Sequence, residues 1–348
     1  AFAVDPTRGL FLMVLMALYI GGAFAIFALA AGRVSEGKQF SMVSRETTLV
    51  ANNLLLSAIL GVVFIGTLYP MVLEAITGEQ ISVGPPYFNR TAIPMALAMA
   101  VLMGVAPFIS WGKSGTKRLP KLLLPAAIAT IVFVVAAIWP FGVRGIGWIA
   151  GFAAAAWLGT ACIAILARKG LTLGLAGMAI AHLGVAVTIL GATASGALQR
   201  EALVAMQVGD RVDVGPWTVE LADVRPIAGP NWTAVEATLE ARQGDRLVAT
   251  LHPQSRMFIA PQQETTESGR AGWRAGELYS ALGQPGDGAR WQVHLWVKPL
   301  VRLIWIGGLL MAFGGLLALG GNLKARAPAG WRQRRHARAR RQSGVQPA

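Results

Sequence analysis

Charged residues are scarce in this sequence of 348 residues: Asp, Glu, Lys and Arg make up 14%, whereas hydrophobic residues make up 54%. Soluble domains carry about a quarter charged residues. The composition and the mean hydropathy of +0.53 therefore exclude a water-soluble globular protein. They also exclude an intrinsically disordered chain, because so many apolar side chains cannot stay solvated. We therefore expect a membrane protein.

Cysteine and the common catalytic motifs are also lacking. The single cysteine, Cys162, lies in an apolar run, which excludes an internal disulfide, a CxxC pair and a cysteine-based zinc site. We expect it to be an inert, buried thiol. There is no Walker loop, HExxH or GxSxG sequence. The chain begins at Ala1 with no basic segment before the first apolar run, so we expect no signal peptide and a piece of a longer or processed protein.

Seven apolar segments are long enough to cross a bilayer, which takes about 20 helical residues. Pro94, Pro107 and Pro125 interrupt the third and fourth segments, and membrane helices tolerate proline where neighbouring groups satisfy the freed carbonyls. We therefore expect an α-helical polytopic membrane protein with about seven transmembrane helices. The predicted spans are 10–31, 50–73, 92–110, 121–140, 146–167, 172–195 and 300–321.

The distribution of the net charge of +14 indicates topology. With the N-terminus outside, the inner segments hold 17 Lys and Arg residues, and the short outer segments hold only Arg8, Arg90 and Arg144. This asymmetry follows the positive-inside rule, and it predicts an outer N-terminus and an inner C-terminus. The tail, 323–348, has eight basic and no acidic residues, which is typical of a segment lying on anionic lipid. We therefore expect membrane lipid, and no nucleic acid, as a partner.

Residues 199–298 differ from the rest of the chain. They hold 12 of the 17 acidic residues, and apolar residues alternate with polar ones, which predicts strands with one buried face. We expect a small antiparallel β sandwich or barrel of six or seven strands on the outer side, before the last helix, with strands near 202–208, 217–222, 231–240, 246–252, 255–260, 277–282 and 291–297. The predicted domains are a six-helix membrane region (1–198), this β domain (199–298), the last transmembrane helix (299–322) and the basic tail (323–348).

His182 is the candidate site residue, because no other histidine lies in a predicted span. It lies roughly 15 Å into the sixth span from its inner end, and ionisable residues at such depth usually mark a functional site. A stripe of small residues beside it (Gly177, Ala181, Gly184, Thr188 and Gly191) lets something flat or close-packed approach the helix. Three roles fit: an interhelical hydrogen bond, an axial haem ligand, or a relay in a proton path. We expect surface positions for His252 and His294 in the β domain and for His336 in the tail.

Several segments carry a family resemblance. In order along the chain they are "AFAVDPTRG" at the start, "SRETTLVANNLLLSAILGVVFIGTLYP" (44–70), "ISVGPPYFN" (81–89), "MAIAHLGVAVTILG" (178–191), "GPNWTA" (229–234), "ATLHPQSRMF" (249–258) and "VKPLVRLIWIGGLLMAFGGLLALGG" (297–321). Over about residues 1–322 the chain resembles the C-terminal half of the CcmF/NrfE haem lyase family of bacterial cytochrome c biogenesis.

The resemblance implies a role for His182, which stands where the second of two transmembrane histidines of the family ligates the iron of a structural b-type haem. The first of those histidines, the tryptophan-rich WWD segment and the two periplasmic histidines that flank it have no counterpart here. We therefore expect the C-terminal part of a haem lyase of the bacterial inner membrane, with haem b as cofactor, no assigned catalytic residue and no competence alone.

The implied reaction is the covalent attachment of haem to apocytochrome c on the periplasmic side. The implied partners are the N-terminal half, as part of the same protein or as a separate subunit, together with apocytochrome c and a haem chaperone. Two other hypotheses stay open: a transporter with a polar path through His182, and a membrane scaffold whose β domain docks partners.

Overall fold

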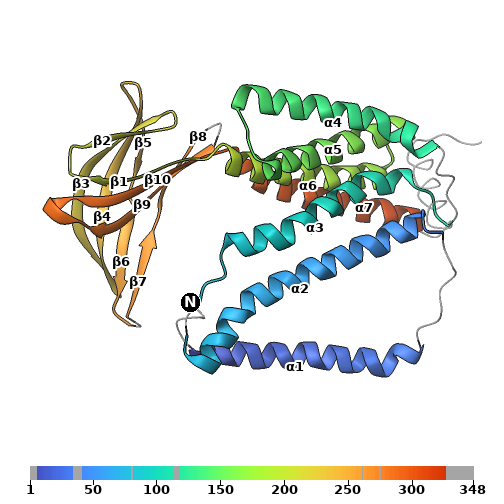
Figure 1. Ribbon diagram of the computed structural model, residues 1–348, viewed down its shortest axis with the longest axis horizontal. Coiled ribbons are helices and arrows are strands. Elements are labelled where there is room, and N and C mark those ends of the chain that lie inside the picture. Colours follow the sequence, from blue (N-terminus) through green and yellow to red (C-terminus); the bar gives the residue numbers. More distant parts are fainter. Residues whose placement is uncertain are drawn as a thin grey trace, which may run out of the picture. The chain divides into compact units, whose positions relative to one another are not determined.

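The computed structural model describes residues 6–33, 41–79, 81–112, 118–260, 262–273 and 276–326. Within these ranges, seven helices are long and apolar enough to cross a membrane, and an antiparallel β domain precedes the last of them (Figure 1). The predicted fold class is therefore confirmed. Of the predicted basic tail, 323–348, all but the first four residues lie outside the described part of the chain. The chain forms two compact units, residues 1–127 and 128–348, and each is described by itself.

The first unit contains three apolar helices and the beginning of a fourth. The helix α2 begins after Ser44, whose hydroxyl accepts a hydrogen bond from the Thr47 amide at 3.2 Å. It ends at Gly78, where a left-handed φ of 74° closes the last turn. The elements are α1 (Pro6–Ala30), η1 (Ala31–Arg33), α2 (Arg45–Thr77), α3 (Pro85–Val105), η2 (Ala106–Phe108) and α4 (Leu119–Phe141), which continues into the second unit.

The start of α2 is attached to the segment that follows η2. The Gly112 amide donates to both carboxylate oxygens of Glu46, at 2.9 and 3.0 Å. The Arg45 amide donates to the Ser110 carbonyl at 3.0 Å, and the Arg45 guanidinium lies 5.1 Å from the centre of the Trp111 ring. These polar contacts explain why α2 begins five residues before the predicted span, because an average of hydropathy detects only the apolar middle of a helix.

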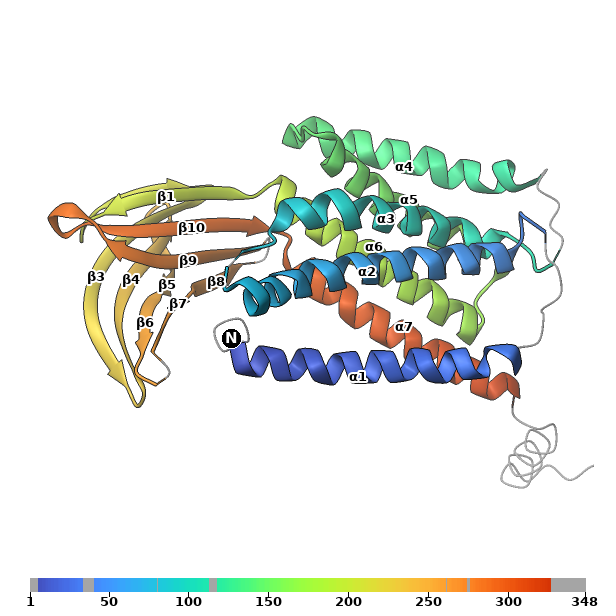
Figure 2. The same ribbon diagram turned by 60° about the horizontal axis from the view of Figure 1, so that its bottom comes forward.

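The second unit contains α5 (Ile146–Lys169), α6 (Leu173–Ala197) and α7 (Arg302–Arg326). Both views show α6 and α7 side by side (Figures 1 and 2). Leu158 of α5 is fully buried, and Cys162 on the same helix is 7% exposed. The expectation that the cysteine is buried is confirmed.

The β domain has two antiparallel sheets that pack face to face. One has the strand order β1-β10-β9-β8, and the other has the order β2-β3-β4-β6-β7 with β5 also paired to β4. The strands are β1 (Arg200–Met206), β2 (Arg211–Val214), β3 (Trp217–Gly229), β4 (Trp232–Gln243), β5 (Arg246–Leu251), β6 (Gln254–Phe258), β7 (Gln263–Glu267), β8 (Gly269–Trp273), β9 (Gly276–Pro285) and β10 (Trp291–Pro299).

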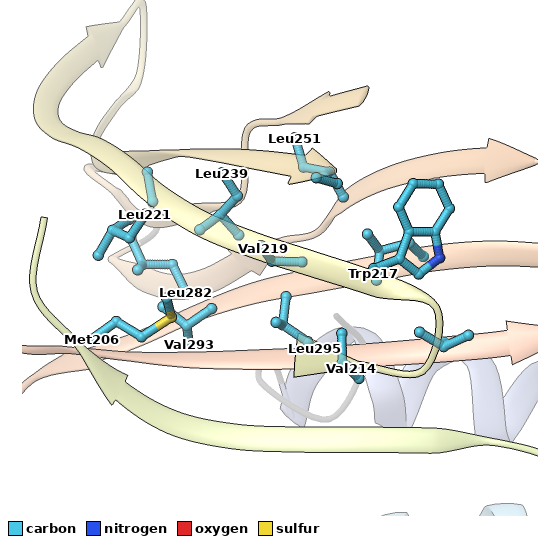
Figure 3. Packing of buried hydrophobic residues seen from close by; sticks show 14 residues of the cluster. Met206, Val214, Trp217, Val219, Leu221, Leu239, Leu251, Leu282, Val293 and Leu295 are labelled. Carbon is cyan, nitrogen blue, oxygen red and sulfur yellow. The ribbon is translucent and has the colours of Figure 1, made fainter. Parts of the chain in front are cut away.

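The core of the domain lies between the sheets (Figure 3). Every second residue of a strand points inward, and these positions carry Leu, Val and Trp side chains. Val219 and Leu221 of β3, Leu239 of β4 and Val293 of β10 are 0% exposed. The Trp217 ring packs edge-on against Trp273, with 5.4 Å between ring centres.

The prediction of six or seven strands was too low, because ten are present among the described residues. The three missed strands are β2, β7 and β8, each four or five residues long. Runs of four or five residues are too short for alternation to identify a strand, and β7 carries only polar residues. Pairing with β3, β6 and β9, respectively, makes them strands.

Candidate functional site

His182 lies in the middle third of α6, as the sequence predicts. Its Nδ1 atom is 2.9 Å from the carbonyl oxygen of Met178, one turn earlier on the same helix. A carbonyl oxygen only accepts hydrogen bonds, so this contact assigns the ring proton to Nδ1. The Nε2 atom of the neutral ring then carries a free lone pair, which is the state of a histidine that binds a metal.

The row of small residues nearest to His182 is not the stripe that the sequence suggests. Residues three before and four after a helical residue lie on its own face, and for His182 these are Ala179 and Ala186, which are 2% and 4% exposed. A Cβ added at Gly159 of α5 would be 4.0 Å from the Ala186 Cβ atom. This face of α6 is therefore turned toward α5, and the imidazole is half-buried at its edge.

The predicted stripe is the contact surface for α7. A Cβ added at Gly184 would be 2.6 Å from the Gly307 carbonyl oxygen and from the Met311 amide nitrogen. A Cβ added at Gly177 would be 2.3 Å from the Ala318 amide nitrogen of α7. The stripe thus lets a helix approach. His182 follows Ala181 and therefore points about 100° away from it around the helix.

The arrangement fits one axial ligand of a haem. The Nε2 lone pair is free, the neighbouring residues are small, and a neutral imidazole needs no counter-ion in an apolar setting. A second ligand is not at hand in the described part of the chain, where the other histidines are His252 and His294 of the β domain. Among the described residues there is also no cluster of three His, Cys, Asp or Glu side chains that could hold a metal ion.

Both of these histidines lie on the β domain, as expected. His252 follows β5, its side chain is 49% exposed, and its Nδ1 atom is 3.9 Å from the Glu236 carboxylate. His294 lies on β10 and pairs through Nε2 with the Glu201 carboxylate of β1. His336 lies outside the described residues.

A second polar group was not singled out from the sequence. Glu277 and Tyr279 of β9, Lys298 of β10 and Arg302 at the start of α7 meet on the outward face of the four-stranded sheet. Alternation within each strand predicts that the three strand residues point outward. The register of β9 against β10, which brings Lys298 opposite Glu277, comes only from the structure.

Comparisons with known proteins agree with the resemblance. Residues 197–299 match the family described as the CcmF C-terminal beta-sandwich. The chain is 36% identical over 325 residues to the cytochrome c-type biogenesis protein CcmF of Escherichia coli K12. The alignment covers 92% of this chain and 50% of that protein. It is also 36% identical over 339 residues to the cytochrome c-type biogenesis protein ccl1 of Rhodobacter capsulatus. That alignment covers 92% of this chain and 50% of ccl1.

The NrfE protein of Haemophilus influenzae, another cytochrome c-type biogenesis protein, is 31% identical, with 92% of this chain and 51% of NrfE covered. The chain thus spans about half the length of the curated relatives it matches. A solved structure titled cytochrome c heme lyase CcmF matches with a TM-score of 0.63 and 24% identity, over 80% of this chain and 46% of that one. At this identity it shows the likeness of the fold alone.

Proposed function

We propose that the chain is the C-terminal part of a haem lyase, because residues 197–299 match the CcmF C-terminal β-sandwich and 92% of the chain matches about half the length of cytochrome c-type biogenesis proteins. In this proposal it takes part in the covalent attachment of haem to apocytochrome c on the periplasmic side. The observation that carries the proposal is the place of His182 in the middle of a membrane helix, with its Nδ1 atom 2.9 Å from the Met178 carbonyl oxygen, which leaves Nε2 as the nitrogen that would bind iron.

In this proposal His182 is one axial ligand of a haem b within the membrane. Bound there, the iron would supply one-electron redox chemistry. The Met178 carbonyl holds the ring in one orientation and one tautomer. The imidazole is half-buried at the edge of the face on which Ala179 and Ala186 are packed. The second ligand would come from the N-terminal half of the protein or from a separate subunit that takes its place.

The proposal also covers the location of the protein in the cell and the boundaries of its domains. The seven long apolar helices and the likeness to CcmF proteins support a location in the inner membrane. The N-terminus and the β domain would face the periplasm, and the basic tail the cytoplasm, as the positive-inside asymmetry indicates. The boundaries stay those of the sequence analysis: a membrane region at 1–198, the β domain at 199–298, the last helix at 299–322 and the tail at 323–348. Apocytochrome c and a haem chaperone would be the partners on the periplasmic side.

The test is the absorption spectrum of the protein purified from its own membranes, together with the polypeptide that supplies the N-terminal half of its relatives. The parent protein should show the signature of a haem with two histidine ligands, and His182→Ala should lose it. The control is His252→Ala, which removes an exposed histidine of the β domain and should leave the spectrum unchanged. If His182→Ala keeps the spectrum while the protein stays folded, the ligand assignment is wrong.

A further inference from the structure

Large apolar side chains lie in a row along the exposed face of α7. Trp305 is 75% exposed, and Leu309, Phe313 and Leu316 are exposed as well. Residues three or four apart lie on the same face of a helix, so these four side chains follow one another along one face, and we call them the apolar row. The row begins one turn after Arg302, which is the first residue of α7.

The apolar row differs from the face of α7 that contacts α6. On that face Gly307 and Gly314 bring the two helix backbones together. Helices associate in a bilayer through such small residues, because lipid tails are as apolar as leucine. A row of tryptophan, leucine and phenylalanine is therefore typical of a face that contacts acyl chains. Tryptophan is also enriched where the hydrocarbon meets the headgroups, and Trp305 lies in the first turn of α7.

Two cations lie above the apolar row, where β10 joins α7. Arg302 donates through Nε to the Glu277 carboxylate of β9 at 3.4 Å, and its side chain is 49% exposed. Lys298 of β10 is opposite Glu277 in the register, and its ammonium lies 5.0 Å from the centre of the Tyr279 ring. Among the described residues, Lys298 forms no ion pair with a carboxylate. Both cations therefore lie next to Glu277, and only Arg302 is paired with it.

The carboxylates of this region do not neutralise all of its cations. Among the described residues, the outward face of the four-stranded sheet and the start of α7 carry three cations and two carboxylates: Arg270, Lys298, Arg302, Glu201 and Glu277. Glu201 pairs with His294. The hydrogen bond from Tyr279 to Glu277 raises the pKa of the phenol, which therefore stays neutral at physiological pH. With His294 neutral, one positive charge is left over for an anion.

We propose that Lys298, Arg302 and the apolar row form a binding site for an anionic phospholipid in the leaflet on the side of the β domain. The phosphate of the headgroup would meet the two cations, and an acyl chain would lie along the apolar row. The single negative charge of a lipid such as phosphatidylglycerol matches the positive charge that the carboxylates leave over. The proposal goes beyond the proposed function, because it involves no haem.

The two cations suit a phosphate. A guanidinium can donate two parallel hydrogen bonds to phosphate oxygens, and an ammonium acts as a point charge. Glu277 accepts a hydrogen bond only from Nε of Arg302 among the described residues, and the guanidinium has four further N–H donors. Phosphatidylcholine offers the same phosphate but also carries an ammonium group. Its net charge is zero, so the surplus positive charge of the site attracts it less.

The experiment uses the full chain in nanodiscs of phosphatidylcholine and records the fluorescence of Trp305, obtained as the difference between each protein and its Trp305→Phe counterpart. Phosphatidylglycerol or phosphatidylcholine with brominated acyl chains replaces an increasing fraction of the lipid, because bromine quenches a tryptophan only at close contact. The signal therefore reports on this site and not on lipid bound elsewhere, such as at the basic tail. Hydrogen exchange of the β9, β10 and α7 amides verifies that each variant is folded.

We expect brominated phosphatidylglycerol to half-quench Trp305 at about one fifth of the fraction that brominated phosphatidylcholine needs, because one positive charge at a membrane surface favours an anionic lipid by about this factor. The double variant Lys298→Ala, Arg302→Ala should lose the preference. Glu277→Gln should strengthen it, since it removes a negative charge and keeps an oxygen that accepts from Arg302. The matched control, Arg246→Ala with Arg290→Ala, removes two exposed cations elsewhere in the β domain and should behave like the parent.

Two results would overturn the proposal. One is equal quenching by the two brominated lipids in the parent, or an unchanged preference in the folded double variant. The other comes from the protein purified with the polypeptide that supplies the N-terminal half of its relatives. If neither lipid quenches Trp305 there, the apolar row is covered by protein and not by lipid. Neither result depends on the His182 spectrum, so failure here and failure of the proposed function can be told apart.

Discussion

In the β domain the buried positions carry large aliphatic and aromatic side chains, whereas at the contact of α6 with α7 they carry glycine and alanine. Leu239 and Leu295 in the sandwich are 0% exposed, but Leu309 and Leu316 on α7 are 72% and 69% exposed. The difference reflects the solvent. In water, burying leucine removes apolar surface from an unfavourable environment. In a bilayer the lipid tails are as apolar as leucine, so helices gain by close backbone contact, which needs small residues.

The largest expected effect comes from applying the same substitution in both regions. Leu295→Ala on β10 should reduce the free energy of opening of the β domain by about 2–5 kcal/mol, because it creates a cavity in a close-packed core. Leu316→Ala on α7 should change the stability by less than about 0.5 kcal/mol. Hydrogen exchange of the strand and helix amides in the full chain measures both effects. Equal losses at the two sites would show that the contrast between the regions is wrong.

The adjacent glycines of α7 provide a second, sharper comparison. A Cβ added at Gly314 would be 2.8 Å from the Ala181 Cα atom, whereas among the described residues nothing lies within 4 Å of a Cβ added at Gly315. Gly314→Val should therefore destabilise the contact of α6 with α7 by about 1–3 kcal/mol through overpacking. Gly315→Val, with the same change in side chain and helix propensity, should have little effect. The measurement is thermal unfolding in detergent, and the prediction fails if the two variants unfold alike.

The smallest predicted effect concerns a charge on the sandwich. Glu236 of β4 is 8% exposed, and its carboxylate accepts hydrogen bonds from Arg225 at 2.9 Å and from Gln254 at 2.6 Å. Since the side chain of Arg225 is 58% exposed and screened, we expect Glu236→Gln to cost about 1 kcal/mol at neutral pH. Glu220→Gln, which breaks the more exposed pair with Arg211, is the control and should cost less.

The same pair predicts a dependence on pH. The Arg225 hydrogen bond, with smaller contributions from Gln254, the Arg225 charge and His252, lowers the pKa of Glu236, although burial opposes the shift. The stabilisation is therefore present above the unfolded pKa of about 4.3 and is lost as the pH falls through the lower folded value. The parent and Glu236→Gln should thus differ at pH 7 and converge at strongly acidic pH. A difference that stays constant from pH 7 downward would contradict this cause.

Much of the architecture could be predicted from local patterns. The apolar runs identified all seven long helices of the described chain, because a membrane span is determined by its own length and composition. Period-two alternation identified the longer strands. It missed β2, β7 and β8, which are only four or five residues long and become strands by pairing with the strand next to them in sequence. The Glu46 carboxylate accepts a hydrogen bond from the Gly112 amide, which is 66 residues away in the sequence. No local pattern indicates such a contact.

For the candidate site, too, some features could be predicted from the sequence and others come only from the structure. The sequence by itself determined that His182 lies deep in an apolar helix and that a row of small residues runs near it, since both follow from spacing along one helix. Only the tertiary structure decided that this row belongs to α7 and that the imidazole lies on the side of α5. It also brought Lys298 and Arg302 close to Glu277 and Tyr279. The reason is physical: a helix or a strand specifies its own faces, but the partner of each face is chosen by packing among elements that are far apart in the chain.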